Sequence, residues 1–159
     1  MNTRFTLRKK MLVLTVLPIF VLGILVIFLS LTVVKNAMVS EIEDALRSAA
    51  TATFAAYDQN SGSYIEAANG DIWKGSYNIS KSESIVDSIK EKSGMEVTFF
   101  YGNRRIMTSA VDANGNRILG SPAGVKIVET VLNNGEEYFS HAVSIDGTIF
   151  YGYYTPVYQ

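Results

Sequence analysis

The sequence contains no cysteine and a single histidine, His141, among its 159 residues. Without cysteine the chain has neither disulfide bonds nor thiolate ligands, and one histidine cannot form a histidine-based metal cluster. Charge is scarce and balanced, with 14 Lys plus Arg against 15 Asp plus Glu, so no basic surface for nucleic acid is expected. Phosphate-binding glycine loops and nucleophile motifs are also missing from the sequence. We therefore expect no metal, no cofactor, no nucleic-acid partner and no enzymatic activity.

One long uncharged segment is present, from Met11 to Val34. About 20 such residues are enough for a helix to cross the hydrocarbon core of a membrane. A cleaved signal peptide is the alternative, but it needs a shorter apolar core of about 7 to 15 residues and a small-residue cleavage site. Basic residues precede the segment, namely Arg4, Arg8, Lys9 and Lys10. By the positive-inside rule we expect a cytoplasmic tail over 1–10, a transmembrane helix over 11–34 and the remaining chain outside.

A second helix is expected directly after the membrane segment, over residues 35–57. Six small or apolar residues recur there at alternating steps of four and three, the spacing of an a/d seam: Met38, Ile42, Ala45, Ala49, Ala52 and Ala56. This seam has two interpretations. Either it forms a homodimer with the same helix of a second copy, or it packs on the chain's own domain.

The remaining residues, 58–159, are expected to form one small domain of α+β class. The stretch 58–80 is rich in Gly, Asn and Ser and is expected to be irregular loop. Ser80 and Glu83 have capping-box spacing and start a short helix that Gly94 ends. A second short helix is expected over 125–132, shortly after Pro122.

Two antiparallel hairpins are predicted in this domain. Alternating strand formers flank a two-residue turn in both of them: 95–110 around Gly102-Asn103, and 137–157 around Asp146-Gly147. The expected architecture is therefore a transmembrane helix that continues into a long helix, followed by an antiparallel sheet with short helices.

Regular pairing sorts the side chains of the last hairpin onto two faces. The more apolar face is expected to be core: Phe139, His141, Val143, Ile145, Thr148, Phe150 and Tyr154. Small residues alternate with tyrosines on the other: Tyr138, Ser140, Ala142, Ser144, Ile149, Tyr151, Tyr153 and Thr155. That second face either lines a small polar cavity or is solvated.

The first hairpin carries two consecutive arginines, of which one should point inward. Regular pairing places Arg105 with Thr98 and Phe100, and Arg104 with Tyr101 and Thr108. An inward guanidinium needs an anionic partner, because an unpaired buried charge is costly. That partner is a ligand carboxylate or a buried acid of the protein, unless the arginine reaches water.

From about Asp58 onward the chain resembles the single Cache sensor domains of bacterial methyl-accepting chemotaxis receptors. The resemblance rests on VTFFYGNRRIMTSAVDANGNRILGSPA (97–123), EYF (137–139), YGYYTPV (151–157) and the order of tail, membrane helix, long helix and domain. It implies a PAS-like antiparallel sheet that binds a small metabolite outside the bacterial cell membrane. Arg105 and Thr108 look like the recurrent hairpin residues of that family, although regular pairing puts them on opposite faces.

Together these arguments define an expected ligand-binding set of hairpin residues: Arg105, Thr108, Phe100, Tyr101, Tyr138, Ser140, Tyr151 and Tyr153. Small carboxylates are the first ligand class to test, because an inward arginine and tyrosine hydroxyls suit them.

The type of protein remains open among three alternatives. Receptors that the chain resembles continue with a last strand, a second membrane helix, a HAMP linker and a signalling coiled coil. This chain is therefore expected to be the N-terminal part of one, either as a fragment of a longer receptor or as the product of a truncated gene. The sensor region of a histidine kinase fits the same residues. A pilin-like structural subunit fits less well, because pilins resemble one another in a Gly before the processed Phe and a Glu inside the apolar run. Here Arg4 precedes Phe5, and the first acid is Glu41.

Overall fold

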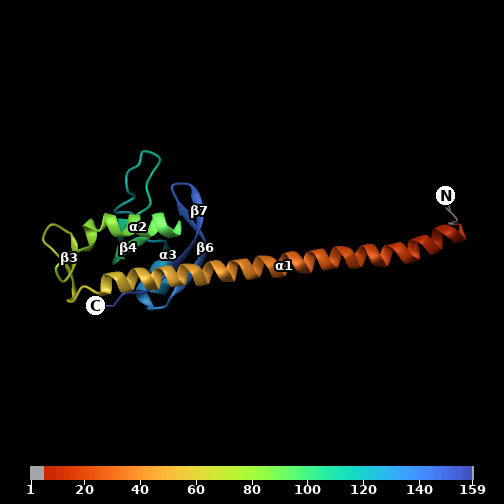
Figure 1. The fold of residues 1–159 in the computed structure, drawn as a ribbon, viewed down its shortest axis with the longest axis horizontal. Coiled ribbons are helices and arrows are strands. Elements are labelled where there is room, and N and C mark those ends of the chain that lie inside the picture. The colour runs from red at the N-terminus through yellow and green to blue at the C-terminus, as the bar shows by residue number, and fades with distance from the viewer. Residues whose placement is uncertain (1–5, 159) are drawn as a thin grey trace. The chain divides into compact units, whose positions relative to one another are not determined.

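The computed structural model describes residues 6–158, and Figure 1 shows the order of its elements. It contains two compact units, Met1–Glu41 and Ile42–Gln159. The first helix, α1 (Leu7–Asp58), covers the predicted apolar segment and continues to the predicted end of the long helix. Within the expected tail over 1–10, residues 1–5, and Arg4 with them, lie outside the described part.

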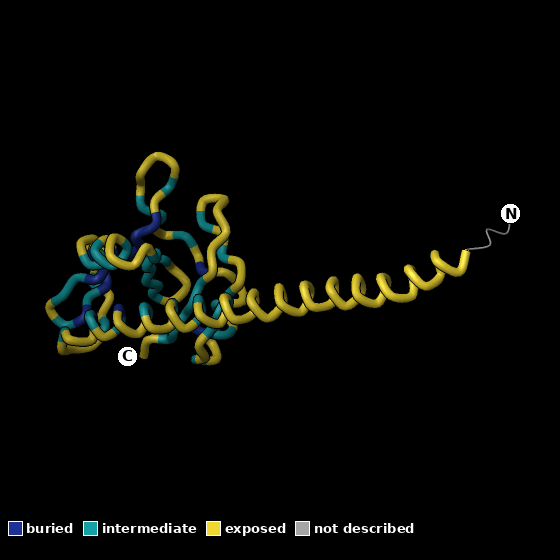
Figure 2. The backbone as a smooth tube through the Cα atoms, turned by 45° about the vertical axis from the view of Figure 1, so that its right-hand side comes forward, coloured by how far each residue is buried: buried dark blue, intermediate teal, exposed yellow. Residues whose placement is uncertain are grey.

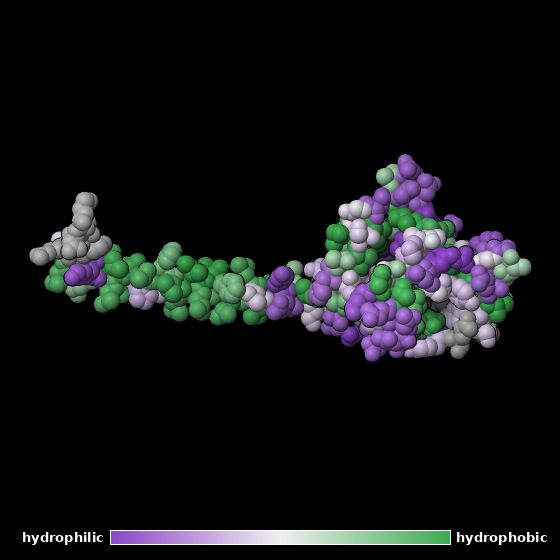
Figure 3. Space-filling model, turned by 180° about the vertical axis from the view of Figure 1, so that it is seen from behind, coloured by the Kyte–Doolittle hydropathy of each residue, from purple (hydrophilic) through white to green (hydrophobic). Residues whose placement is uncertain are grey.

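In the first unit α1 is apolar on its whole circumference. Every residue from Thr6 to Met38 is exposed, and Figure 3 shows apolar side chains over most of this stretch, with hydrophilic ones near its two ends. The hydroxyls of Thr15 and Thr32 donate to the helix carbonyls of Met11 and Phe28, at 3.1 and 2.9 Å, which hides their polarity. Of the described helices, α1 is the one long and apolar enough to cross a membrane.

In the second unit the last turns of α1 enter the core. The buried residues in Figure 2 lie in this unit, and Tyr57 is fully buried among them. Its ring meets Phe99 edge-on at 4.4 Å between centroids, and its hydroxyl donates to Ser82 Oγ at 2.6 Å. Ile72, Ile79 and Ile106 complete the cluster. The core therefore fixes the C-terminal end of α1.

A small antiparallel sheet occupies the stretch that was expected to be loop. Its strands are β1 (Tyr64–Glu66), β2 (Ile72–Lys74) and β3 (Tyr77–Asn78), in the order β1-β2-β3. The expectation of irregular structure over 58–80 is wrong, because two or three residues are too few to show alternation between turns. Tertiary burial of Ile72 and Lys74 on the central strand stabilises the sheet instead.

The first short helix begins later than its predicted capping box. A 3-10 turn, η1 (Ile79–Lys81), precedes α2 (Glu83–Ser93), whose N-cap is Ser82. Ser80 does not cap the helix, because its Oγ accepts a hydrogen bond from the backbone N–H of Ile72 at 2.9 Å. The predicted end is confirmed, since Gly94 adopts φ 71° and closes the helix in the left-handed conformation.

The second short helix is confirmed, with an unexpected geometry. It starts as α3 (Val125–Ile127) and continues as the π-helix η2 (Val128–Asn133).

Both predicted hairpins are confirmed. The first pairs β4 (Thr98–Tyr101) with β5 (Arg104–Thr108), and the second pairs β6 (Tyr138–Ile145) with β7 (Thr148–Tyr154). At the second turn Asp146 and Gly147 have φ of 46° and 79°, as a two-residue turn with both residues left-handed requires. The α+β class is therefore as expected, with three small antiparallel sheets in residues 6–158.

Candidate functional site

A β-bulge in the first hairpin changes which side chains share a face. Phe100 pairs with Arg105, but after a register shift Thr98 pairs with Thr108 rather than with Met107. Thr98 and Phe100 lie on one face of β4, so Arg105 and Thr108 share a face as well. The expectation that they lie on opposite faces is wrong, because the bulge adds one residue to β5.

The guanidinium of Arg105 is half-buried and poorly paired. Its Cζ lies 5.4 Å from the centroid of the Phe100 ring. Among the described residues its buried Nε has no hydrogen-bond partner, and its Nη1 makes only a 3.5 Å contact with the carbonyl of Ile118. Burial lowers the pKa of Arg105. Arginine nevertheless stays charged at neutral pH, so a desolvated cation presents unused N–H donors.

Within residues 6–158 no acidic side chain forms an ion pair with Arg105. The carboxylates of neighbouring elements pair with other cations: Glu66 with Arg104 at 3.1 Å, Asp87 with Arg117 at 2.5 Å, and Glu96 with Lys90 at 2.7 Å. Of the partners considered from the sequence, the internal acid is thus not found in the described part of the chain.

A second unpartnered polar group lies directly opposite Arg105. The Arg105 N–H donates to the Ser121 carbonyl at 3.1 Å, and the Gly120 N–H donates to the Arg105 carbonyl at 2.9 Å. Gly120 has φ 76°, which makes this a bulge with glycine in its first position. Ser121 Oγ is buried and has no hydrogen-bond partner in the described residues. A buried unpaired polar atom costs about 1–3 kcal/mol, so the unpartnered side chains of these two paired residues are candidates for contact with a ligand or water.

A bulge in the second hairpin likewise rearranges the tyrosines. After a register shift between Ser140 and Val143, Tyr138 pairs with Tyr154 and Phe139 pairs with Tyr153. The rings of Tyr138 and Tyr154 stack with centroids 6.3 Å apart. The predicted faces, which joined Tyr138 to Tyr153 and Phe139 to Tyr154, are therefore wrong for this half of the hairpin.

Tyr154 brings the second hairpin to the Arg105 face. Burial raises the pKa of the Tyr154 phenol, and the positive charge of Arg105 acts on it in the opposite direction. The phenol is therefore neutral at physiological pH beside the guanidinium. Regular pairing of the hairpin places Tyr154 on the core face, and only the bulge explains its position near Arg105.

Other members of the predicted binding set already make contacts within the protein. Thr108 is fully buried, and its hydroxyl is 2.7 Å from that of Thr98, so it holds the hairpin together. Tyr101 packs against the Tyr57 cluster. Ser140 Oγ accepts a hydrogen bond from the Ala142 N–H at 3.4 Å.

Two predicted tyrosines belong to the opposite face of β7. Tyr151 is 39% exposed and stacks on Phe139 at 5.9 Å. Tyr153 Oη accepts a hydrogen bond from Arg47 Nε of α1 at 2.8 Å and donates one to Glu137. Arg105, Phe100 and Tyr138 are thus the predicted residues that the fold brings together.

The expected core face of the last hairpin is largely solvated near the turn. Phe150 is 38% exposed, and His141 is also exposed. That expectation is wrong for His141 and Phe150, and Phe150 borders, with Ile145 and Thr148, a cavity of about 250 Å³ that residues 110–113 also line.

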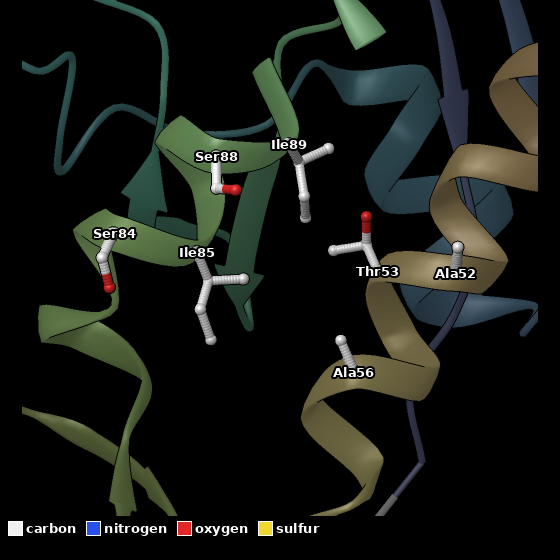
Figure 4. Close-up of a pocket in the computed structure, with 7 residues that line it drawn as sticks. All are labelled: Ala52, Thr53, Ala56, Ser84, Ile85, Ser88 and Ile89. Carbon is white, nitrogen blue, oxygen red and sulfur yellow. The ribbon is translucent and has the colours of Figure 1, made fainter. Parts of the chain in front are cut away.

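A groove of about 400 Å³ lies between α1 and α2. Figure 4 shows its lining, which consists of small, apolar and hydroxyl side chains: Ala52, Thr53, Ala56, Ser84, Ile85, Ser88 and Ile89. The Thr53 hydroxyl is already bonded to the Ala49 carbonyl at 2.7 Å. No charged residue lines this groove. We favour the Arg105 face as the site, because an unpaired charge selects a ligand and volume alone does not.

In the described residues, neither a metal-binding cluster nor an acidic partner is found at the Arg105 face. The described residues contain no cluster of three or more His, Asp or Glu that could hold a metal ion.

Comparison with known proteins identifies one family. The family described as Single cache domain 3 matches residues 77–159, just over half of the chain. The match includes both hairpins and therefore Arg105, Ser121 and Tyr154. No curated protein and no solved structure matches the chain.

Proposed function

The chain belongs to the single Cache domain 3 family, and we propose that its second unit senses a small carboxylate at the Arg105 face. Cache domains sense small molecules outside the cell and are typically ligand-binding modules rather than enzymes. The observation that carries the carboxylate proposal is the half-buried guanidinium of Arg105, whose Nε has no partner among the described residues.

The chemistry of the guanidinium suits a carboxylate in particular. Its N–H groups form a planar fork, which matches the two oxygens of a carboxylate with two parallel hydrogen bonds. The ring of Phe100 supports one face of that fork, with 5.4 Å between Arg105 Cζ and the ring centroid. The free hydroxyl of Ser121 supplies a further donor on the same face. The neutral rings of Tyr138 and Tyr154 provide walls for the uncharged part of the ligand.

The membrane arrangement completes this proposal. The apolar helix α1 and the Cache domain together indicate a membrane protein with an extracellular sensor domain. We propose that the N-terminus is cytoplasmic, since the basic residues precede the apolar segment. We further propose a homodimer through the Ala-seamed part of α1 and a role as the sensing region of a chemoreceptor.

A histidine kinase sensor is the second candidate, because the same extracellular module would serve either output. A pilin-like subunit has no support from the family to which the chain belongs.

Contacts of Tyr153 suggest how binding reaches α1. Tyr153 and Tyr154 are consecutive on β7, and Tyr153 is hydrogen-bonded to Arg47 of α1 at 2.8 Å. A ligand that repositions Tyr154 therefore moves the strand that also holds Arg47. We propose that this shifts α1 by about 1 to 2 Å, the scale of known interface helix shifts.

The test measures thermal unfolding of the full chain in detergent micelles with a panel of small carboxylates. A ligand at a hundred times its dissociation constant stabilises the folded state by about 2.7 kcal/mol. Arg105→Lys keeps the charge and loses the fork, so affinity should fall about tenfold to a hundredfold. Arg104→Lys is the matched control, because Arg104 is exposed and paired with Glu66. No stabilisation by any carboxylate, or equal affinity in Arg105→Lys, contradicts the proposal.

A further inference from the structure

We infer that Asn134 is a site of spontaneous modification, at which the side-chain amide is converted to a carboxylate. The inference does not rest on the proposed function. The sequence contains three Asn-Gly pairs, at residues 69–70, 114–115 and 134–135. Glycine has no Cβ, so its backbone nitrogen can approach the side chain of the residue before it. These pairs are therefore the positions where an asparagine reacts most readily with its own backbone.

The reaction needs only the asparagine, the glycine nitrogen and water. The Gly135 nitrogen forms a bond to Cγ of Asn134, the bond from Cγ to the side-chain nitrogen breaks, and ammonia leaves with the proton of the Gly135 N–H. Water then opens the resulting cyclic imide at either carbonyl. The products are aspartate and isoaspartate, in which the backbone runs through the former side chain. A glycine N–H that is donated to a carbonyl is held away from Cγ, so its hydrogen bond slows the first step.

The first of the three pairs is held by hydrogen bonds at both of its residues. The Gly70 N–H donates to the carbonyl of Ala67 at 2.8 Å. The side-chain amide of Asn69 donates to the carboxylate of Asp71 and accepts from its backbone N–H, both at 3.1 Å. Neither the attacking nitrogen nor the reacting carbonyl of this pair can move without breaking a bond.

The second pair is held by the turn that contains it. The Gly115 N–H donates to the carbonyl of Asp112 at 3.0 Å. The carboxylate of Asp112 also accepts hydrogen bonds from the backbone N–H groups of Asn114 and Asn116, at 2.9 and 2.8 Å. An approach of the Gly115 nitrogen to its neighbouring side chain therefore disrupts this turn.

The third pair lacks such protection. Asn134 is exposed at the end of η2, where its own N–H donates to the carbonyl of Glu129 at 3.2 Å. Within residues 6–158 the Gly135 N–H has no hydrogen-bond partner, and the Asn134 side chain forms no hydrogen bond there either. The attacking nitrogen and the reacting carbonyl can thus meet without the loss of a contact.

The fold also requires glycine at residue 135. Its φ is 71°, and a Cβ at this residue would lie 2.6 Å from Tyr158 Oη, which donates to the Gly135 carbonyl at 2.8 Å. Any other residue is strained here, so the fold itself maintains the reactive pair. Modification acts on the same place, because it adds a negative charge and, in isoaspartate, a longer backbone next to the residue that Tyr158 contacts.

The experiment follows the conversion of amide to acid at all three pairs of one chain. The full chain is incubated in detergent micelles at mildly alkaline pH, and peptide mass spectrometry after digestion quantifies the acid at each asparagine. We expect Asn134 to convert at least about fivefold faster than Asn69 and Asn114, which corresponds to about 1 kcal/mol for one broken hydrogen bond. In the chain unfolded by guanidinium chloride the three pairs should convert at comparable rates, because these hydrogen bonds are lost.

Asn134→Gln is the matched variant, because its amide lies one carbon further from the Gly135 nitrogen. It should abolish the fast conversion and leave the rates at Asn69 and Asn114 unchanged. The inference is overturned if Asn69 or Asn114 converts as fast as Asn134 in the folded chain. It is also overturned if Asn134 stays intact in the folded chain while the unfolded chain converts, or if the ratios of the three rates are the same in both.

Discussion

Tyr153 and Tyr154 are consecutive residues of β7 whose side chains serve opposite faces of the second hairpin. Tyr154 stacks on Tyr138 at 6.3 Å near Arg105, whereas Tyr153 is hydrogen-bonded to Arg47 of α1 at 2.8 Å. Two adjacent residues of β7 therefore connect the candidate ligand site to α1, the helix that begins at Leu7. This connection makes a mechanical role for Tyr153 testable apart from binding.

Tyr153→Phe removes the hydroxyl that bonds Arg47 and Glu137 and keeps the ring in place. We expect ligand affinity to change by less than roughly twofold, as for other surface substitutions away from the ligand. The response of α1 to ligand should be lost. It can be measured as a ligand-dependent distance between spin labels at Thr51→Cys on α1 and Thr148→Cys on β7, because the chain has no other cysteine.

Tyr151→Phe is the control for that measurement, since Tyr151 is exposed and its hydroxyl makes no hydrogen bond in the described residues. A distance change of equal size in Tyr153→Phe and the unmodified labelled chain would contradict the relay.

Ser121→Asp places a carboxylate opposite Arg105 and tests whether ligand binding depends on the unpaired charge of Arg105. An internal ion pair then occupies the guanidinium, so we expect affinity for a small carboxylate ligand to fall at least about tenfold. Ser121→Asn, which is similar in size and uncharged, is the control and should retain binding within roughly threefold, given the modest net value of one hydrogen bond. Calorimetry measures both affinities. If both variants bind like the parent chain, Ser121 does not lie in the site.

The burial of Tyr57 predicts that the folded state loses stability at alkaline pH. Burial raises its pKa to about 12 in the folded chain, above the usual value near 10 of an unfolded tyrosine. Between these two pKa values the folded state binds more protons than the unfolded state, so the free energy of unfolding falls as pH rises from one to the other. Below the lower pKa, Tyr57 adds no pH dependence to the free energy of unfolding. Urea unfolding at pH 9, 10 and 11 measures the slope.

In Tyr57→Phe this slope should be shallower by the contribution of one tyrosine. The variant also loses the bond to Ser82 and should be about 1 kcal/mol less stable at neutral pH. Identical slopes in the two chains would show that Tyr57 ionises in both states alike.

Local chemistry was enough to predict most elements. Any fold must either expose the uncharged segment Met11–Val34 as a helix or bury that helix in a membrane. Gly94 ends α2, and Asp146-Gly147 ends β6 in a turn, because these residue types permit the left-handed backbone conformation. These features depend on residues close in sequence, so a sequence reveals them. The strands β1, β2 and β3 were not predicted, because they are too short to show the alternation of apolar and polar residues. Burial by residues distant in sequence stabilises them instead.

The candidate site depended on information that no short segment contains. The strand pattern indicates that Arg104 or Arg105 points inward, and the family resemblance singles out Arg105. Which neighbours it has was decided by two bulges and by the pairing of Ser121 with β5. Each bulge moves every later side chain of its strand to the other face, and strand register is set by the sum of contacts across the sheet. The sequence by itself thus determined the long apolar helix and the two hairpins with their pair of arginines; tertiary structure alone decided that Arg105 pairs with Ser121 and lies near Tyr154, and that Tyr153 meets Arg47.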